Sequence, residues 1–173
     1  SIQRRFQKII EESPAPDIEN SIVQEMSECA VNFATNQHYE GAGTVEFIYD
    51  IDEKKFYFLE MNTRIQVEHP VTEAITSTNL IAWQLEIANG LQLPVLQENL
   101  NINGWAVEAR LYAENVDNNF APQSGTIHHL NFPDDIKCPN CKIETGIRNG
   151  DYISPFYDPM IAKIISHGDN RNQ

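Results

Sequence analysis

The stretch FLEMNTRIQVEHPVTE, residues 58–73, joins an apolar, strand-like run to a dense set of polar side chains. The run ends at Glu60 and Asn62, and Arg64, Gln66 and Glu68 follow at alternate positions before a proline. Alternate residues of an extended chain project to the same side. Polar groups therefore collect where a strand ends, which fits either a binding site or a solvated face.

The residues before this stretch predict the partner of the strand. The segment TVEFIYDIDEKKFYFLEMN, residues 44–62, is typical of a β-hairpin whose loop centres near Glu53. The register that keeps apolar residues together places Glu46 opposite Glu60 on one face, with Thr44 opposite Asn62 and Ile48 opposite Phe58. The other face then pairs Val45 with Met61, Phe47 with Leu59 and Tyr49 with Tyr57. A slip of one residue would scatter the apolar set.

Two glutamates that face each other on one side of a hairpin are destabilising by themselves. Glu46, Glu60 and Asn62 offer hard oxygen donors, which suit Mg²⁺ or Mn²⁺ better than zinc. Few protein ligands and several open positions suit a metal that also holds phosphate oxygens. The alternative is a solvated outer face whose glutamates point into water.

The residues after Asn62 predict an anion pocket. If the chain stays extended, Arg64, Gln66 and Glu68 share a face. Arg64 offers a planar fork for a small oxyanion, and Gln66 adds an orientable amide. A carboxylate beside a bound anion, at Glu68, fits a proton acceptor. The alternative is a surface Arg–Glu pair, which contributes little energy.

Composition limits the class of protein. The 173 residues carry 12 Lys+Arg against 25 Asp+Glu, a net charge of −13. Nucleic-acid binders show a basic excess, and no apolar run here approaches the length of a membrane span. Three cysteines fit a reducing compartment. We therefore expect an intracellular protein with neither nucleic acid nor membrane as partner. The first residue is not Met, from which we expect a fragment of a longer chain.

The remaining chain predicts mixed secondary structure. Residues 1–10 alternate as in a strand, and Ile22, Met26 and Phe33 fall at helical spacing after a capping box of Ser21 and Gln24. A mainly helical stretch runs from Pro70 to Ala88, and a connector follows at about residues 90–103. Strands are expected at residues 105–113, 126–131, 143–145 and 160–166.

The pair Cys138 and Cys141 invites a zinc hypothesis. A structural zinc site needs four ligands, and a second cysteine pair is missing, although His128 and His129 lie upstream. We expect a simple loop here.

The long stretch that opens this section resembles the signature of the biotin carboxylase family, the ATP-grasp component of biotin-dependent carboxylases. The segments QRRFQKIIEESPAP, GAGTVEF, AVEARLYAEN and YDPMIAK occur in the family's order, so the resemblance covers essentially the whole chain. It is closest to the acyl-CoA carboxylase α subunits, such as the methylcrotonyl-CoA and propionyl-CoA enzymes.

The resemblance implies a reaction in which ATP, bicarbonate and carrier-bound biotin give N1-carboxybiotin, ADP and phosphate. It assigns the metal, Mg²⁺ or Mn²⁺, to the three oxygen donors named above, of which the two glutamates also meet the nucleotide. It assigns bicarbonate to Arg64, Gln66 and the backbone N–H of Val67, and the general base to Glu68. Arg110 matches the arginine that stabilises the biotin enolate.

Gln3 and Lys8 match positions that line the nucleotide and bicarbonate regions. Phe6 departs from the family pattern, which usually has His there, and a phenyl ring cannot hydrogen-bond to a ribose or a phosphate. A degenerate or truncated, non-catalytic module for assembly is therefore the alternative function.

The implied fold class is α+β. Residues 1–103 would be the C-terminal part of an ATP-grasp domain, and residues 104–173 a truncated biotin carboxylase C-terminal domain. We expect a biotin carboxyl carrier domain and a carboxyltransferase subunit as partners, a homo-oligomer, and a location in the cytoplasm or the mitochondrial matrix. The isolated chain should not turn over.

Overall fold

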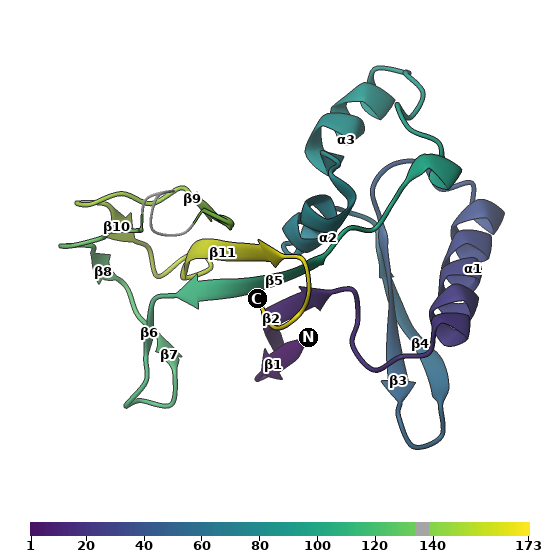
Figure 1. Cartoon of the computed structure of the whole chain (residues 1–173). Helices are drawn as coiled ribbons and strands as arrows, with labels where there is room; N and C mark the ends of the chain where they lie inside the picture. Colours follow the sequence, from purple (N-terminus) through teal and green to yellow (C-terminus); the bar gives the residue numbers. More distant parts are fainter. Residues whose placement is uncertain (134–138) are drawn as a thin grey trace. The chain divides into compact units, whose positions relative to one another are not determined.

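The computed structural model describes residues 1–133 and 139–173. They form two compact units, one of Ser1–Ser13 with Asn103–Gln173 and the other of Pro14–Ile102. Both helices and antiparallel strands are present, which confirms the α+β class (Figure 1). Within the described ranges no helix has both the length and the apolar character that crossing a membrane requires. The division into two domains near residue 103 stays a prediction.

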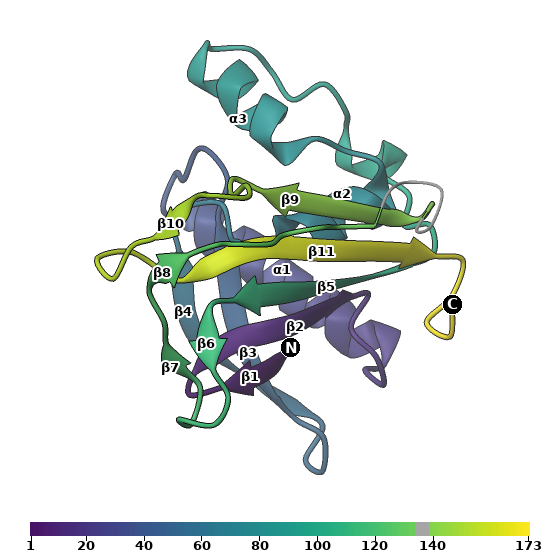
Figure 2. The same ribbon diagram turned by 90° about the vertical axis from the view of Figure 1, so that its left-hand side faces the viewer.

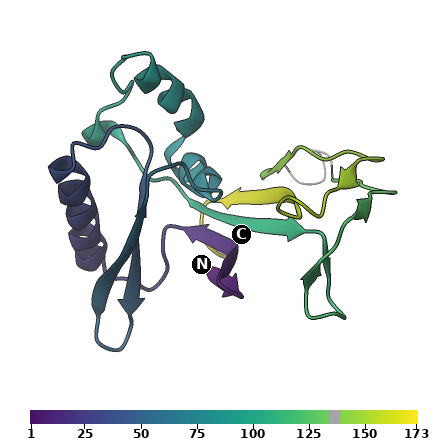
Figure 3. The same ribbon diagram turned by 180° about the vertical axis from the view of Figure 1, so that it is seen from behind.

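The unit of Pro14–Ile102 combines three helices, a short 3₁₀ turn and a hairpin. Its elements are α1 (Asn20–Asn36), β3 (Thr44–Asp50), β4 (Lys55–Asn62), α2 (His69–Thr76), α3 (Leu80–Ala88) and η1 (Gln97–Asn99). The helix α1 lies alongside the hairpin (Figure 3), and the rings of Phe33 and Phe58 are 5.4 Å apart. The predicted helical regions are confirmed. The helical stretch after Pro70 is divided by Ser77, which ends α2 with a φ of 54°.

The predicted capping box is wrong. Glu19 is the residue that begins α1, in an extended conformation and without a side-chain cap, so Ser21 already lies inside the helix. The side chain of Gln24 instead donates to Glu28, 2.9 Å away and one turn further along the same helix.

The register of the hairpin is confirmed at its open end and wrong beyond it. Thr44 pairs with Asn62, Val45 with Met61 and Glu46 with Glu60, but Phe47 pairs with Phe58 instead of Leu59, because a bulge follows Glu46. The bulge places Phe58 on the same side as Phe47, with ring centroids 6.4 Å apart. Aromatic packing therefore outweighs the regular alternation that the sequence predicts.

The unit of Ser1–Ser13 and Asn103–Gln173 is built on a five-stranded antiparallel sheet of order β1-β2-β5-β11-β9 (Figure 2). Its strands are β1 (Ile2–Arg4), β2 (Gln7–Ser13), β5 (Trp105–Tyr112), β9 (Cys141–Thr145) and β11 (Met160–Gly168). Two short pairs accompany it, β6 (Glu114–Asn115) with β7 (Ala121–Pro122) and β8 (Gly125–Thr126) with β10 (Tyr152–Ile153). Its buried apolar residues include Ala106, Ala162 and Ile165.

Two strand predictions in this unit need correction. Residues 1–10 do not form one strand: Arg5 and Phe6 take positive φ angles of 52° and 63°, and the chain folds back as the β1–β2 hairpin. Left-handed residues at both turn positions match the twist of the flanking strands. The strand expected at residues 126–131 ends already at Thr126.

Candidate functional site

The two facing glutamates occupy the open end of the β3–β4 hairpin, where the predicted register holds. Glu46 lies directly opposite Glu60, and the side-chain nitrogen Nδ2 of Asn62 donates to Oε1 of both, at 3.0 and 3.2 Å respectively. The structure therefore brings the three predicted metal ligands together.

The donor set fits a divalent cation. The amide N–H group of Asn62 lies between two carboxylates, a position that suits positive charge. Rotation of the amide would present its oxygen in place of the nitrogen, which makes three hard oxygen donors. Within residues 1–133 and 139–173 no group of three or more His, Cys, Asp or Glu side chains could hold a metal. A cation bound by the two glutamates would therefore take the amide oxygen of Asn62 as its third ligand.

Gln66 connects this cluster to Arg64. Its Nε2 donates to Glu46 Oε1 at 3.1 Å, and its Oε1 accepts from Arg64 Nη1 at 2.9 Å. Only 8% of Gln66 is exposed, so the amide has a fixed partner on each side. Arg64 and Asn62 are therefore linked through Gln66 and Glu46 by direct hydrogen bonds.

The chain does not stay extended past Asn62, and that expectation is wrong. It bends at Thr63 and Arg64 and turns at Val67 and Glu68, and Glu68 begins α2 with φ −81° and ψ 8°. Pro70 lies in the first turn of α2, where its missing N–H costs nothing.

His69 fixes this turn. Its backbone N–H donates to the carbonyl oxygen of Gln66 at 3.3 Å, and its ring Nδ1 lies 2.8 Å from the same oxygen. The histidine acts as a structural hydrogen-bonding residue, and it anchors the backbone next to Val67 and Glu68.

Arg110 lies on β5, in the other unit. Its Nη2 donates to Oε1 of Glu11 at 2.9 Å, and its Nε is 4.0 Å from Oε1 of Glu108. Sequence reasoning missed both glutamates. The spacing of Glu108 and Arg110 shows that they share a face, but the contact with Glu11 depends on the pairing of strands almost 100 residues apart.

Gln3 and Lys8 are directly opposite each other in the β1–β2 hairpin, so the structure brings these two predicted residues together. Phe6 lies in the tight turn between them and is 99% exposed. Arg4, the last residue of β1, forms an ion pair with Glu114 and lies over the ring of Phe120, 3.9 Å from its centroid.

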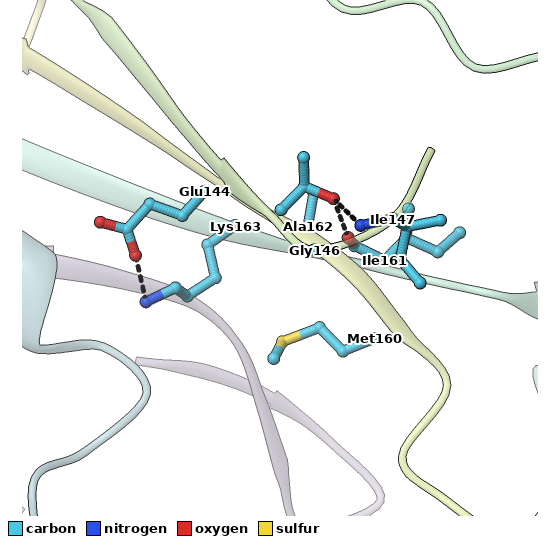
Figure 4. Close-up of a pocket in the computed structure, with 8 residues that line it drawn as sticks. Glu144, Gly146, Ile147, Met160, Ile161, Ala162 and Lys163 are labelled. Carbon is cyan, nitrogen blue, oxygen red and sulfur yellow. Dashed lines mark hydrogen bonds and ion pairs between the residues drawn. The ribbon is translucent and has the colours of Figure 1, made fainter. Parts of the chain in front are cut away.

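A surface hollow between β9 and β11 contains none of the predicted site residues. Its lining includes Glu144, Met160 and Lys163, and Figure 4 shows Lys163 reaching Glu144 across the two strands, with Nζ and Oε2 2.6 Å apart. The zinc hypothesis at Cys138 and Cys141 involves Cys138, which lies outside the described residues.

Two family models match the chain. Residues 1–96 match the ATP binding domain of the carbamoyl-phosphate synthase L chain, and residues 108–173 match the biotin carboxylase C-terminal domain.

Relatives and solved structures agree with these matches. The mitochondrial methylcrotonoyl-CoA carboxylase subunit alpha of Rattus norvegicus is 53% identical over 99% of this chain, and biotin carboxylase 1 of Bacillus subtilis is 47% identical over 100%. The chain spans 24% and 38% of the length of these two proteins. A biotin carboxylase domain dimer of Hydrogenobacter thermophilus 2-oxoglutarate carboxylase superposes with a TM-score of 0.91, at 40% identity. That alignment covers 98% of this chain and 37% of the solved one.

The fold and the matched models define an ATP-grasp-like carboxylase segment of mixed helix and sheet. The chain belongs to the biotin carboxylase family.

Proposed function

We propose that this chain provides the metal, bicarbonate and biotin side of a biotin carboxylase active site. The complete enzyme would convert ATP, bicarbonate and carrier-bound biotin into N1-carboxybiotin, ADP and phosphate. The chain spans about a quarter of the rat relative, so the remaining parts of the site would come from other segments.

One observation carries the proposal: the direct hydrogen bonds that join Arg64, Gln66, Glu46 and Asn62. A cation held by the hairpin and an anion held by Arg64 would lie at the two ends of this series. A phosphoryl donor and its acceptor need this kind of fixed proximity. The Hydrogenobacter enzyme was solved with magnesium ADP and bicarbonate, the same pair of ligand types.

Each side chain of the series has a chemical role in this proposal. Glu46, Glu60 and Asn62 would hold Mg²⁺ or Mn²⁺, which would neutralise charge on the phosphates of ATP. The guanidinium of Arg64, the amide of Gln66 and the N–H of Val67 would bind bicarbonate. Gln3 and Lys8 would contribute to binding the nucleotide and bicarbonate.

Glu68 would start the reaction as general base. It would take the proton of bicarbonate, whose oxygen then attacks the γ-phosphorus of ATP as ADP leaves. The resulting carboxyphosphate breaks down to CO₂ and phosphate, and the phosphate accepts the N1 proton of biotin. The guanidinium of Arg110 would stabilise the enolate-like oxygen of biotin, and N1 of this enolate then attacks CO₂.

The test of the proposal is Glu68→Gln in the complete enzyme. We expect bicarbonate-dependent ATP turnover with free biotin to fall by about a hundredfold or more, because a general base contributes roughly 10²–10⁴. Nucleotide binding should be retained, since the amide has the same size. The control is Glu28→Gln, an exposed glutamate of α1 that accepts a surface hydrogen bond from Gln24. Unchanged turnover in Glu68→Gln would remove the assigned role.

The partners follow from the same proposal. Biotin would arrive on a biotin carboxyl carrier domain, and a carboxyltransferase subunit would use the carboxybiotin. We propose a homo-oligomeric, intracellular enzyme. The rat relative is a mitochondrial subunit alpha, and the Hydrogenobacter structure is a dimer.

Phe6 supports one alternative, a degenerate copy that serves assembly without catalysis. Phe6 is 99% exposed, at the position where the resemblance implies that the family usually has His. Phe6→His separates the two functions. A gain of activity from a zero baseline would favour the degenerate copy, and measurable turnover with Phe6 in place would favour the enzyme.

A further inference from the structure

Two acidic residues are buried side by side in the five-stranded sheet. Glu11 of β2 lies directly opposite Glu108 of β5, and the two residues are 5% and 0% exposed, respectively. Directly opposed residues of an antiparallel pair project to the same face. Two like charges so placed oppose folding unless positive charge lies close to both.

Arg110 supplies that charge. It is two residues beyond Glu108 on β5, so its side chain emerges on the same face. Its Nη2 donates to Glu11 Oε1 at 2.9 Å, and its Nε lies 4.0 Å from Glu108 Oε1. Only 10% of the Arg110 side chain is exposed. Glu11 accepts a hydrogen bond from the guanidinium and Glu108 forms an ion pair with it, so both carboxylates favour one orientation of its plane.

The other neighbour of β5 places a second cation beside Arg110. On β11, Lys163 lies opposite Arg110 and Ile165 lies opposite Glu108. Lys163 is engaged with Glu144 of β9, with Nζ and Oε2 2.6 Å apart (Figure 4). Facing cations repel, so Lys163 favours a guanidinium directed toward β2.

We propose that Glu11 and Glu108 are positioning residues, which hold the Arg110 guanidinium in the orientation that the biotin step requires. The proposal rests on the proposed function, in which Arg110 meets the biotin oxygen. A displacement of about 1 Å in such a group can cost roughly a hundredfold in rate. The carboxylates therefore matter for catalysis although neither needs to touch the substrate.

The test compares Glu108→Gln with Arg110→Met in the complete enzyme. For Glu108→Gln we expect kcat/KM for free biotin to fall by about tenfold or more, because the guanidinium is misplaced. Both a lower kcat and a higher KM should contribute. The KM values for ATP and bicarbonate should stay within twofold of the wild type. In the Arg110→Met background, Glu108→Gln should cost nothing further at the biotin step.

The matched control is Glu12→Gln. This glutamate of β2 is also ion-paired, but its partner is Arg171, and as the neighbour of Glu11 it projects to the other face of the strand. It should leave the biotin parameters unchanged. Thermal unfolding is recorded for every variant, and Glu11→Gln repeats the test from the other strand if Glu108→Gln does not fold.

Each outcome decides the matter. Wild-type biotin kinetics in Glu108→Gln, when Arg110→Met is impaired, would overturn the positioning role and leave the proposed function intact. Equal losses for ATP and biotin, or the absence of folded protein in both glutamine variants, would show a purely structural role and also overturn it. Unimpaired Arg110→Met would remove the role of Arg110 in the proposed function, and the positioning role with it.

Discussion

Replacing Asn62 by leucine separates a metal site from a solvated acidic face. Leucine keeps the size of the side chain but removes the donor to both Glu46 and Glu60. The part-buried bond to Glu46 is charge-assisted, and its loss costs about 1.5–3 kcal/mol. The exposed bond to Glu60 adds roughly 0.5 kcal/mol. Metal-free protein should therefore lose about 2 kcal/mol or more, which lowers Tm by roughly 4–8 °C.

The response of Tm to Mg²⁺ distinguishes the metal site from the solvated face. If the Asn62 oxygen is a ligand, its loss should weaken binding by an amount similar to one charge-assisted contact, about 1.5–3 kcal/mol. That corresponds to roughly a 10- to 150-fold higher Kd. The assay records Tm of the complete enzyme over a Mg²⁺ titration, and Kd is obtained by fitting the stabilisation to RT ln(1 + [Mg²⁺]/Kd).

The control is Asn79→Ala. Asn79 caps α3 by accepting the N–H of Ala82 at 2.9 Å, and its loss costs about 1 kcal/mol. This variant should lower Tm but keep the wild-type Kd for Mg²⁺. The metal assignment is refuted if Asn62→Leu also keeps that Kd, or if Mg²⁺ leaves the wild-type Tm unchanged.

Three further predictions concern other parts of the chain. Gln66→Leu should raise KM for bicarbonate by about tenfold, because it removes the amide that accepts from Arg64. An unchanged bicarbonate KM would contradict the pocket. A hydrogen bond from Arg171 lowers the pKa of Glu12 below 4.5, so its stabilisation is present above pH 4.5 and disappears as the pH falls below that value. Urea unfolding should show Glu12→Gln about 1 kcal/mol less stable at pH 7, and a gap that does not shrink as the pH falls below 4.5 would argue against this origin. Ser77→Gly should raise the free energy of unfolding by about 0.5–1 kcal/mol, because Ser77 has a φ of 54° that glycine adopts without strain. A lower urea midpoint than that of the wild type would show that the serine has another role.

The carboxylate end of the hairpin could be predicted because its register follows from local patterning. Glu46 and Glu60 face each other as expected, since the turn is short and one face is apolar. The bulge beyond them could not be predicted. It depends on the packing of Phe58 against Phe33 of α1 and against Phe47, which is a tertiary contact.

The contacts of Arg110 could not be predicted from the sequence, for a related reason. Its face on β5 is readable from the sequence, but Glu11 reaches it only because β2 pairs with β5. The chain after Asn62 was misjudged because alternate polar residues resemble a strand. Pro70 favours a helix start instead, and His69 closes the turn onto Gln66.

The bulge also allows the register at the tip of the hairpin to differ from the register at its open end. Leu59 is the additional residue, so the pairs nearer the tip follow a different alignment from those at Glu46 and Glu60. A mismatch introduced around Asp52 can be taken up at this joint before it reaches the acidic pair. The exposed tip is therefore a natural place to graft a fluorophore or a peptide tag, and a tolerant place for loop lengths to diverge among homologous enzymes.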